Sequence, residues 1–135
     1  MRTLTQIDSH LGHTNYLTEI TAKGFRFVSD EPVADGGQGA GPAPYDYILA
    51  GLAACTLMTL RMYAERKGWQ LGELDLHLSL SKDADKHTHI HRTLKASAEL
   101  APEQWNRLLE ICAKTPVTLT LAQGSTITTS HEGAA

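Results

Sequence analysis

The stretch that decides the fold is PYDYILAGLAACTLMTLRMYAERK, residues 44–67, followed directly by Gly68 and Trp69. A proline in the first turn and a glycine just past the last turn are typical of a helix over Pro44–Lys67. This helix is apolar on every side, so it must be surrounded by protein. In a chain this short, complete enclosure indicates a partner subunit. The bulky face carries Ile48, Leu49, Leu52, Thr56 and Leu60, and the other side carries Ala50, Gly51, Ala53, Ala54 and Leu57.

Around this helix, alternating side chains and turn residues predict six strands and two shorter helices. The expected order is β-β-β-α-β-β-α-α-β, an α+β layout with a central buried helix in a single domain over residues 1–135. The expected strands are Arg2–Asp8, Asn15–Thr21, Phe25–Val28, Glu73–Leu80, His89–Leu100 and Ser125–Ser130.

The two shorter helices are predicted from their first turns. One begins at Pro102, and its buried stripe consists of Trp105, Leu108, Leu109 and Cys112. The other begins at Pro116 after Thr115 as N-cap, runs through Leu121 and ends by Gly124.

Composition narrows the classes of function. The chain of 135 residues has a net charge of −3 and no cluster of Lys and Arg, so we expect no nucleic-acid partner. The N-terminus lacks the apolar core of a signal peptide. The longest uncharged stretch, Tyr47–Leu60, is too short to span a bilayer, so no membrane partner is expected. Two cysteines and no export signal indicate a reducing, cytoplasmic setting.

Between the third strand and the long helix lies Glu31–Pro44, which contains four glycines and three prolines. It has neither the GxGxxG pattern nor the phosphate-binding pattern GxxxxGK followed by Ser or Thr. We therefore interpret it as a loop and expect no nucleotide site there.

Several motifs resemble one known family. The run Gly41–Ala64 has a Gly-Pro-Ala-Pro-Tyr-Asp start and a Met-Thr-Leu-Arg-Met-Tyr-Ala end, and it continues to Lys67-Gly68-Trp69. The run Leu108–Leu121 reads LLEICAKTPVTLTL, and Asp30-Glu31-Pro32 precedes the glycine-rich loop. These residues resemble the OsmC-like subgroup of the OsmC/Ohr family (osmotically inducible protein C and organic hydroperoxide resistance proteins).

The resemblance implies antiparallel sheets around a long central helix in an intertwined homodimer. It also implies that two cysteines reduce organic hydroperoxides: one on the central helix attacks the peroxide, and one before a Pro-Val pair resolves the sulfenic acid. Cys55 matches the attacking cysteine. Thr115 occupies the resolving position, and Cys112 lies three residues earlier.

An acid and an arginine assist the thiol in active members of the family. Many members carry the acid ten residues before the thiol, where this chain has Tyr45, and the related subgroup carries it one residue later, at Asp46. No N-terminal residue aligns with the activating arginine, although Arg26 and Lys23 are nearby in sequence.

The residues themselves leave two interpretations of each thiol open. A peroxide-reducing Cys55 must be a thiolate, and because it lies inside a helix the required cation must come from another strand or subunit. Otherwise Cys55 is a small hydrophobic residue in a tight interface. Cys112 is a core residue, unless it resolves Cys55 as a disulfide. Without a resolving partner, an external thiol could reduce the Cys55 sulfenic acid.

The run His87-Thr88-His89-Ile90-His91 places three imidazoles on one face of a predicted strand, where they could meet a metal. The simpler interpretation is a solvated hairpin end, because the run lacks acid or cysteine ligands and their supporting contacts. We therefore predict no metal and no cofactor.

Two functions are consistent with these observations. The first is thiol-dependent reduction of organic hydroperoxides through Cys55 in a homodimer, with Cys112 and Asp46 in the site and an external thiol as reductant. The second is a non-catalytic protein of the same fold. Its dimer cleft, lined by Cys55, Tyr45 and Tyr47, would bind a small apolar molecule.

Overall fold

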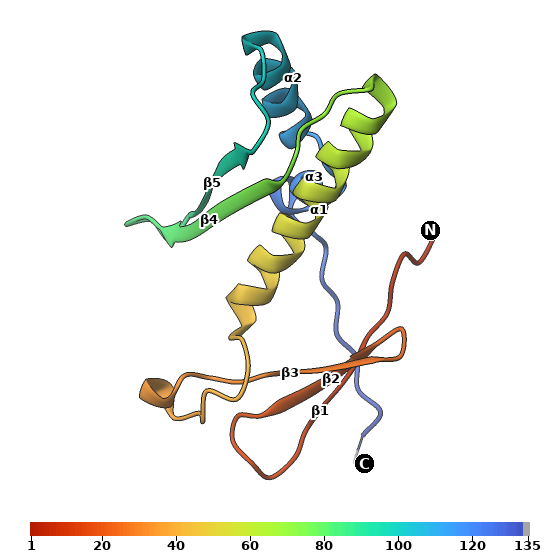
Figure 1. Cartoon of the computed structure of the whole chain (residues 1–135). Helices are drawn as coiled ribbons and strands as arrows, with labels where there is room; N and C mark the ends of the chain where they lie inside the picture. The colour runs from red at the N-terminus through yellow and green to blue at the C-terminus, as the bar shows by residue number, and fades with distance from the viewer. Residues whose placement is uncertain (134–135) are drawn as a thin grey trace. The chain divides into compact units, whose positions relative to one another are not determined.

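The computed structural model describes residues 1–133, and its elements confirm the predicted α+β class (Figure 1). The chain divides into two compact units, one over Met1–Ala50 and one that begins at Gly51. The elements are β1 (Asp8–Leu11), β2 (Thr18–Ala22), β3 (Phe25–Ser29), a 3-10 turn (Val33–Asp35), α1 (Pro44–Lys67), β4 (Leu74–Lys82), β5 (Thr88–Ala96), α2 (Pro102–Cys112) and α3 (Pro116–Gln123).

The first unit is built on an antiparallel meander of β1, β2 and β3. Lys23 and Gly24 connect β2 to β3 with φ angles of 50° and 83°, which confirms the predicted tight turn. Two successive residues with positive φ match the right-handed twist of the paired strands. Among the described residues of this unit only Ser29 and Asp30 are buried, so the sheet has no buried apolar side chain of its own.

The structure corrects two of the predicted strands. The first strand was expected at Arg2–Asp8, but β1 begins only at Asp8. The last was expected at Ser125–Ser130, but these residues form no strand. A threonine-rich segment has high β propensity, yet a strand exists only where another strand pairs with it. The β propensity of residues 125–130 could not show that no strand in the described part of the chain pairs with them.

The long helix α1 has the predicted bounds, and Gly68 follows it with a φ of 72°. Its buried residues recur every fourth position: Leu52, Thr56, Leu60 and Ala64. The opposite face is open, and it exposes Met58 and Met62 by more than half. The enclosure of this helix was expected to need a partner subunit, and that expectation stays a prediction.

By length and composition alone, α1 is apolar enough to cross a membrane. Core helices of soluble proteins meet the same test, so this is weak evidence. In α1 only 22% of the most apolar window is buried. Most of this apolar window is therefore at least partly exposed.

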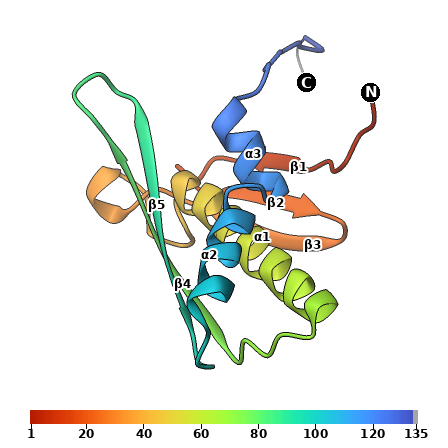
Figure 2. The same cartoon turned by 90° about the horizontal axis from the view of Figure 1, so that it is seen from above.

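The second unit contains the apolar core, which consists of Leu60, Ala64, Leu71, Leu108 and Cys112. Strands β4 and β5 form an antiparallel hairpin (Figure 2). Along β4, inward leucines alternate with outward polar residues, as predicted. In α2, Leu108 and Cys112 are buried as expected, but Leu109 is 57% exposed. The prediction for Leu109 is wrong because the buried stripe of α2 is narrower than an i, i+3, i+4, i+7 pattern suggests.

The entry to α3 follows the predicted order, with Thr115 at the N-cap, Pro116 next and Gly124 at the end. The Thr115 side chain, however, makes no capping hydrogen bond. Its hydroxyl lies 2.6 Å from that of Thr118 instead. Thr115 is fully buried, so its role is to extend a polar network inside the unit and not to cap the helix.

Candidate functional site

Cys55 lies in the middle of α1 and is half-buried. Its sulfur is 3.9 Å from the hydroxyl of Thr59, one turn later on the helix. Successive residues of a helix are rotated by about 100°, so Cys55 borders the open face that carries Met58 and Met62, whereas Thr56 points to the buried face. The structure thus places the predicted thiol at the edge of an apolar surface.

Next to Cys55, Thr56 begins a network that the sequence did not predict. The Thr56 hydroxyl donates to the carbonyl of Leu52 at 2.7 Å and accepts from Nη1 of Arg92 at 2.9 Å. Arg92 Nη1 also donates to the hydroxyl of Thr118 at 2.9 Å, and Nη2 donates to the carbonyl of Cys112 at 3.0 Å. One guanidinium on β5 therefore holds α1, α2 and α3 together.

The half-buried Arg92 makes no ion pair with any carboxylate in the described part of the chain. Its positive charge is met by neutral hydroxyls and a carbonyl. The only sequence signal was a charged residue at an inward position of β5, between Ile90 and Leu94. An inward arginine on an otherwise apolar face requires fixed hydrogen-bond acceptors, and that requirement could have identified Arg92 as part of a buried network.

Cys112 lies in the apolar core, with 8% of its surface exposed. Burial raises the pKa of the Cys112 thiol, and the nearby charge of Arg92 opposes this shift only in part. The thiol therefore stays protonated at neutral pH, whereas a nucleophilic cysteine must be a thiolate. Both cysteines are free in the structure. The disulfide between them stays a prediction.

The predicted acid, Asp46, is in the first turn of α1 and exposed. Its carboxylate accepts the backbone N–H of Ala43 at 2.9 Å, which ties the chain that enters the helix to its first turn. A carboxylate at this end of a helix is also favoured by the helix dipole. The geometry gives Asp46 a structural role in the helix start, and no described contact joins it to a thiol.

The two tyrosines of the predicted apolar cleft differ in their surroundings. Tyr45 is 53% exposed. Tyr47 is half-buried, its ring lies 5.5 Å from that of Phe27, and its hydroxyl donates to the carbonyl of Val28. Tyr47 therefore fastens the start of α1 to β3.

No arginine hydrogen-bonds the Cys55 thiol within residues 51–133 of the described chain. Arg26 is exposed on β3, opposite Thr21, and Lys23 lies in the β2–β3 turn. Arg26 also lines a concave surface of about 400 Å³ on the sheet, together with His10, Ile20 and Phe27.

The predicted three-histidine face is only partly present. His89 and His91 lie on β5 and are exposed, whereas His87 precedes the strand in the hairpin turn. The sequence pattern missed the acids that the turn brings to these histidines, since Asp83 Oδ2 lies 2.8 Å from His89 Nε2.

Three solved structures show what this fold resembles. One is an OsmC like protein from Mycoplasma pneumoniae, at 19% identity, 90% coverage of this chain, 89% of that chain and a TM-score of 0.72. Another is an organic hydroperoxide resistance protein OsmC from Legionella pneumophila, at 22% identity, with 90% of this chain and 90% of that chain covered and a TM-score of 0.61. The third is the organic hydroperoxide resistance protein OhrB of Bacillus subtilis, at 24% identity, with 87% of this chain and 89% of that chain covered and a TM-score of 0.59. No curated protein matches the chain.

At these sequence identities, the structural likeness shows only that the fold is shared. Two of these similar proteins are named for organic hydroperoxide resistance. A family model described as OsmC-like protein matches residues 36–130, which is well over half of the sequence. The chain belongs to the OsmC-like protein family.

Proposed function

We propose that this protein reduces organic hydroperoxides with Cys55 as the attacking thiol, in a homodimer. The observation that carries the proposal is the position of Cys55 in mid-helix at the edge of an open apolar face, beside Met58 and Met62. An apolar surface suits the alkyl group of an organic hydroperoxide better than it suits hydrogen peroxide.

In the proposed reaction, the Cys55 thiolate attacks the distal peroxide oxygen and the O–O bond breaks. The sulfur becomes a sulfenic acid, and the alkoxide takes a proton and leaves as an alcohol. The peroxide gains the two electrons that the sulfur loses. An external thiol then condenses with the sulfenic acid to release water, and a second thiol frees Cys55 and leaves as the external disulfide.

External reduction fits this chain better than resolution by Cys112. The family's resolving position holds Thr115, which is fully buried and contacts Thr118. The Cys112 thiol is held in its protonated form by burial. A protonated, enclosed thiol attacks a sulfenic acid slowly, so a dithiol from solution is the better reductant.

A cation must favour the Cys55 thiolate, and the proposed dimer supplies it. Within residues 51–133 no arginine hydrogen-bonds this thiol. Arg26 is exposed on a sheet that has no buried apolar side chain, so that sheet also requires a covering surface. We propose that the sheet of one copy covers the open α1 face of the other and brings Arg26 toward Cys55.

The test is the consumption of cumene hydroperoxide by the purified protein with dithiothreitol as reductant. Cys55→Ser should abolish consumption, and Cys112→Ser should keep most of it. Arg26→Ala should slow the reaction by about 10-fold or more through loss of the thiolate, while the matched control Arg66→Ala should not. Consumption by Cys55→Ser at the wild-type rate would remove the proposal.

A second candidate function is non-catalytic binding of a small apolar molecule at the same surface. The exposure of two methionines beside the thiol favours it, because methionine surfaces adapt to varied ligands. Saturating fatty acid should then raise the melting temperature of wild type and of Cys55→Ser equally. A shift in neither protein, with peroxide consumption intact, would leave the first function alone.

A further inference from the structure

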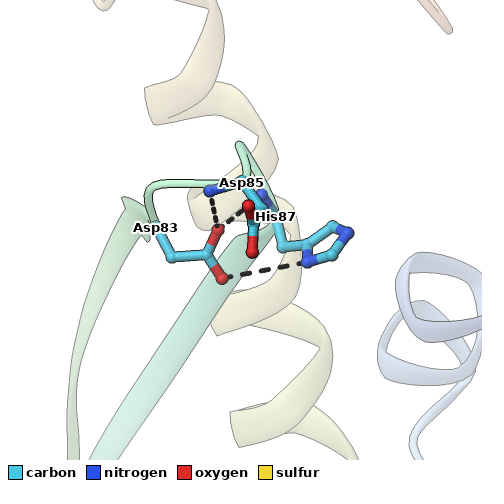
Figure 3. Close-up of side chains that lie close together, drawn as sticks. All are labelled: Asp83, Asp85 and His87. Atoms are coloured by element: carbon cyan, nitrogen blue, oxygen red, sulfur yellow. Dashed lines mark hydrogen bonds and ion pairs between the residues drawn. The ribbon is translucent and has the colours of Figure 1, made fainter.

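The turn of the β4–β5 hairpin gathers carboxylate and imidazole groups at one point. Asp83, Asp85 and His87 each offer one ligand atom, and these atoms lie within 4.8 Å of one another (Figure 3). His89 lies at the start of β5, and its Nε2 is 2.8 Å from Asp83 Oδ2. Two carboxylates and one imidazole are therefore mutually close in the turn, and a second imidazole, on β5, contacts one of the carboxylates.

The backbone of the turn holds Asp83 in place. Its Oδ1 accepts the backbone N–H groups of Asp85 at 2.9 Å and His87 at 3.0 Å. The backbone of Asp83 pairs with that of His87 and accepts the N–H of Lys86, whose φ is 66°. One carboxylate oxygen is thus used by the turn, and the other faces the imidazoles. The orientation of the carboxylate needs no ligand to fix it.

The distances around Asp83 Oδ2 match the spacing of ligands about a small cation. His89 Nε2 lies 2.8 Å from it, and His87 Nδ1 lies 3.8 Å from it. Tetrahedral zinc, with bonds of about 2.0–2.2 Å, spaces its ligand atoms about 3.3 Å apart. The two separations lie on either side of this value, so each imidazole nitrogen is near ligand spacing from Asp83 Oδ2.

We propose that this turn binds one zinc ion through Asp83, Asp85 and His87, with His89, which contacts Asp83, as the fourth ligand. Imidazole nitrogens select borderline-soft ions such as Zn²⁺, whereas Ca²⁺ and Mg²⁺ require six or more oxygens that this turn does not supply. The site shares no residue with Cys55.

The flanking lysines do not close the site. Lys82 donates from Nζ to the hydroxyl of Thr88 at 2.9 Å, on the adjacent strand pair.

The experiment is calorimetric titration of Zn²⁺ into the untagged, full-length protein with both cysteines changed to serine, so that thiols bind no metal. We expect one ion per chain. Asp83→Asn keeps the oxygen that accepts the turn N–H groups but loses the anionic ligand, and it should weaken binding about 10-fold or more, as should His89→Ala. The matched control is His77→Ala, an exposed histidine on β4 outside the turn, and it should bind as the parent does.

Three readouts test zinc binding by this turn independently of peroxide consumption. Co²⁺ should give the intense visible absorption of a tetrahedral site, and Ca²⁺ should not compete with Zn²⁺. Zn²⁺ should raise the melting temperature of the parent but not that of Asp83→Asn. Equal affinity in the parent, Asp83→Asn and His89→Ala, or displacement of Zn²⁺ by Ca²⁺, would overturn the proposal.

Discussion

At the scale of the residue, Arg92 joins acceptors on three helices, from Thr56 to Thr118 and the carbonyl of Cys112. Neutral groups satisfy its guanidinium, so its removal takes one donor away from each of three inward-facing acceptors. An unpaired buried acceptor costs more free energy than the hydrogen bond itself contributed in net terms. The residue beside the thiol, Thr56, is therefore positioned by a side chain on a strand.

The change Arg92→Met should lower the free energy of unfolding by about 1–3 kcal/mol, because the Cys112 carbonyl and two hydroxyls lose their donor. The measurement is urea unfolding followed by circular dichroism. Lys95→Met, an exposed position on the same strand, is the control and should change stability by less than about 0.5 kcal/mol. Equal effects of the two changes would mean that the network contributes no stability.

Asp30 organises the glycine-rich loop in the same way. Its carboxylate accepts the backbone N–H groups of Glu31, Gln38 and Ala40. Burial alone would raise the pKa of Asp30, but these hydrogen bonds outweigh burial and the pKa lies below its ordinary value. The sequence offered this aspartate only as part of a family motif.

Because its folded-state pKa is lowered, ionised Asp30 stabilises the folded protein above its unfolded pKa of about 3.9. That contribution is lost as the pH falls through the lower, folded pKa. Asp30→Asn should therefore be less stable than wild type at pH 7, and the difference should shrink below pH 4. Unfolding curves across this pH range measure it. A difference that stays constant to pH 2 would contradict the assigned role.

At the scale of the element, α1 has two unlike faces. Leu52, Thr56, Leu60 and Ala64 are buried at intervals of four residues, and Leu60 and Ala64 belong to the core with Leu71 and Leu108. The opposite face exposes its methionines. The buried face fixes the helix within the chain, which leaves the thiol edge available for another molecule.

Leu60→Ala should cost about 2–5 kcal/mol of stability, since Leu60 is fully buried and its truncation leaves a cavity. Chemical denaturation measures the loss. The control Glu65→Ala removes an exposed side chain from the same helix and should change stability little. A small loss in Leu60→Ala would show that the core collapses around the gap.

At the scale of the whole molecule, the second unit has an exposed apolar helix face and the first unit has a sheet without buried apolar side chains. Exposed apolar patches of this kind are typical of interfaces between proteins. In the homodimer that we propose, a second copy would supply both surfaces at once, because the helix of each copy would cover the sheet of its partner.

Light scattering should give twice the chain mass for wild type. Met58→Glu places a charge in the proposed interface and should yield the single-chain mass, because an unpaired charge is costly to bury. Arg66→Glu, which changes an exposed residue of the same helix, should stay dimeric. A wild-type protein with the single-chain mass at high concentration would exclude the homodimer, and with it the supply of Arg26 to Cys55 across the interface.

The sequence by itself determined the bounds of α1, the β2–β3 turn, the start of α3 and the family, because these follow from neighbouring residues: a proline, a glycine, a periodic run. Only the tertiary structure decided which face of α1 is buried, that Leu109 is exposed, that Ser125–Ser130 forms no strand, and that Asp83 meets His89. Arg92 shows the reason most clearly, since it bonds to residues 36 and 26 positions away in the chain. Such contacts depend on how elements pack together, and no local pattern encodes that packing.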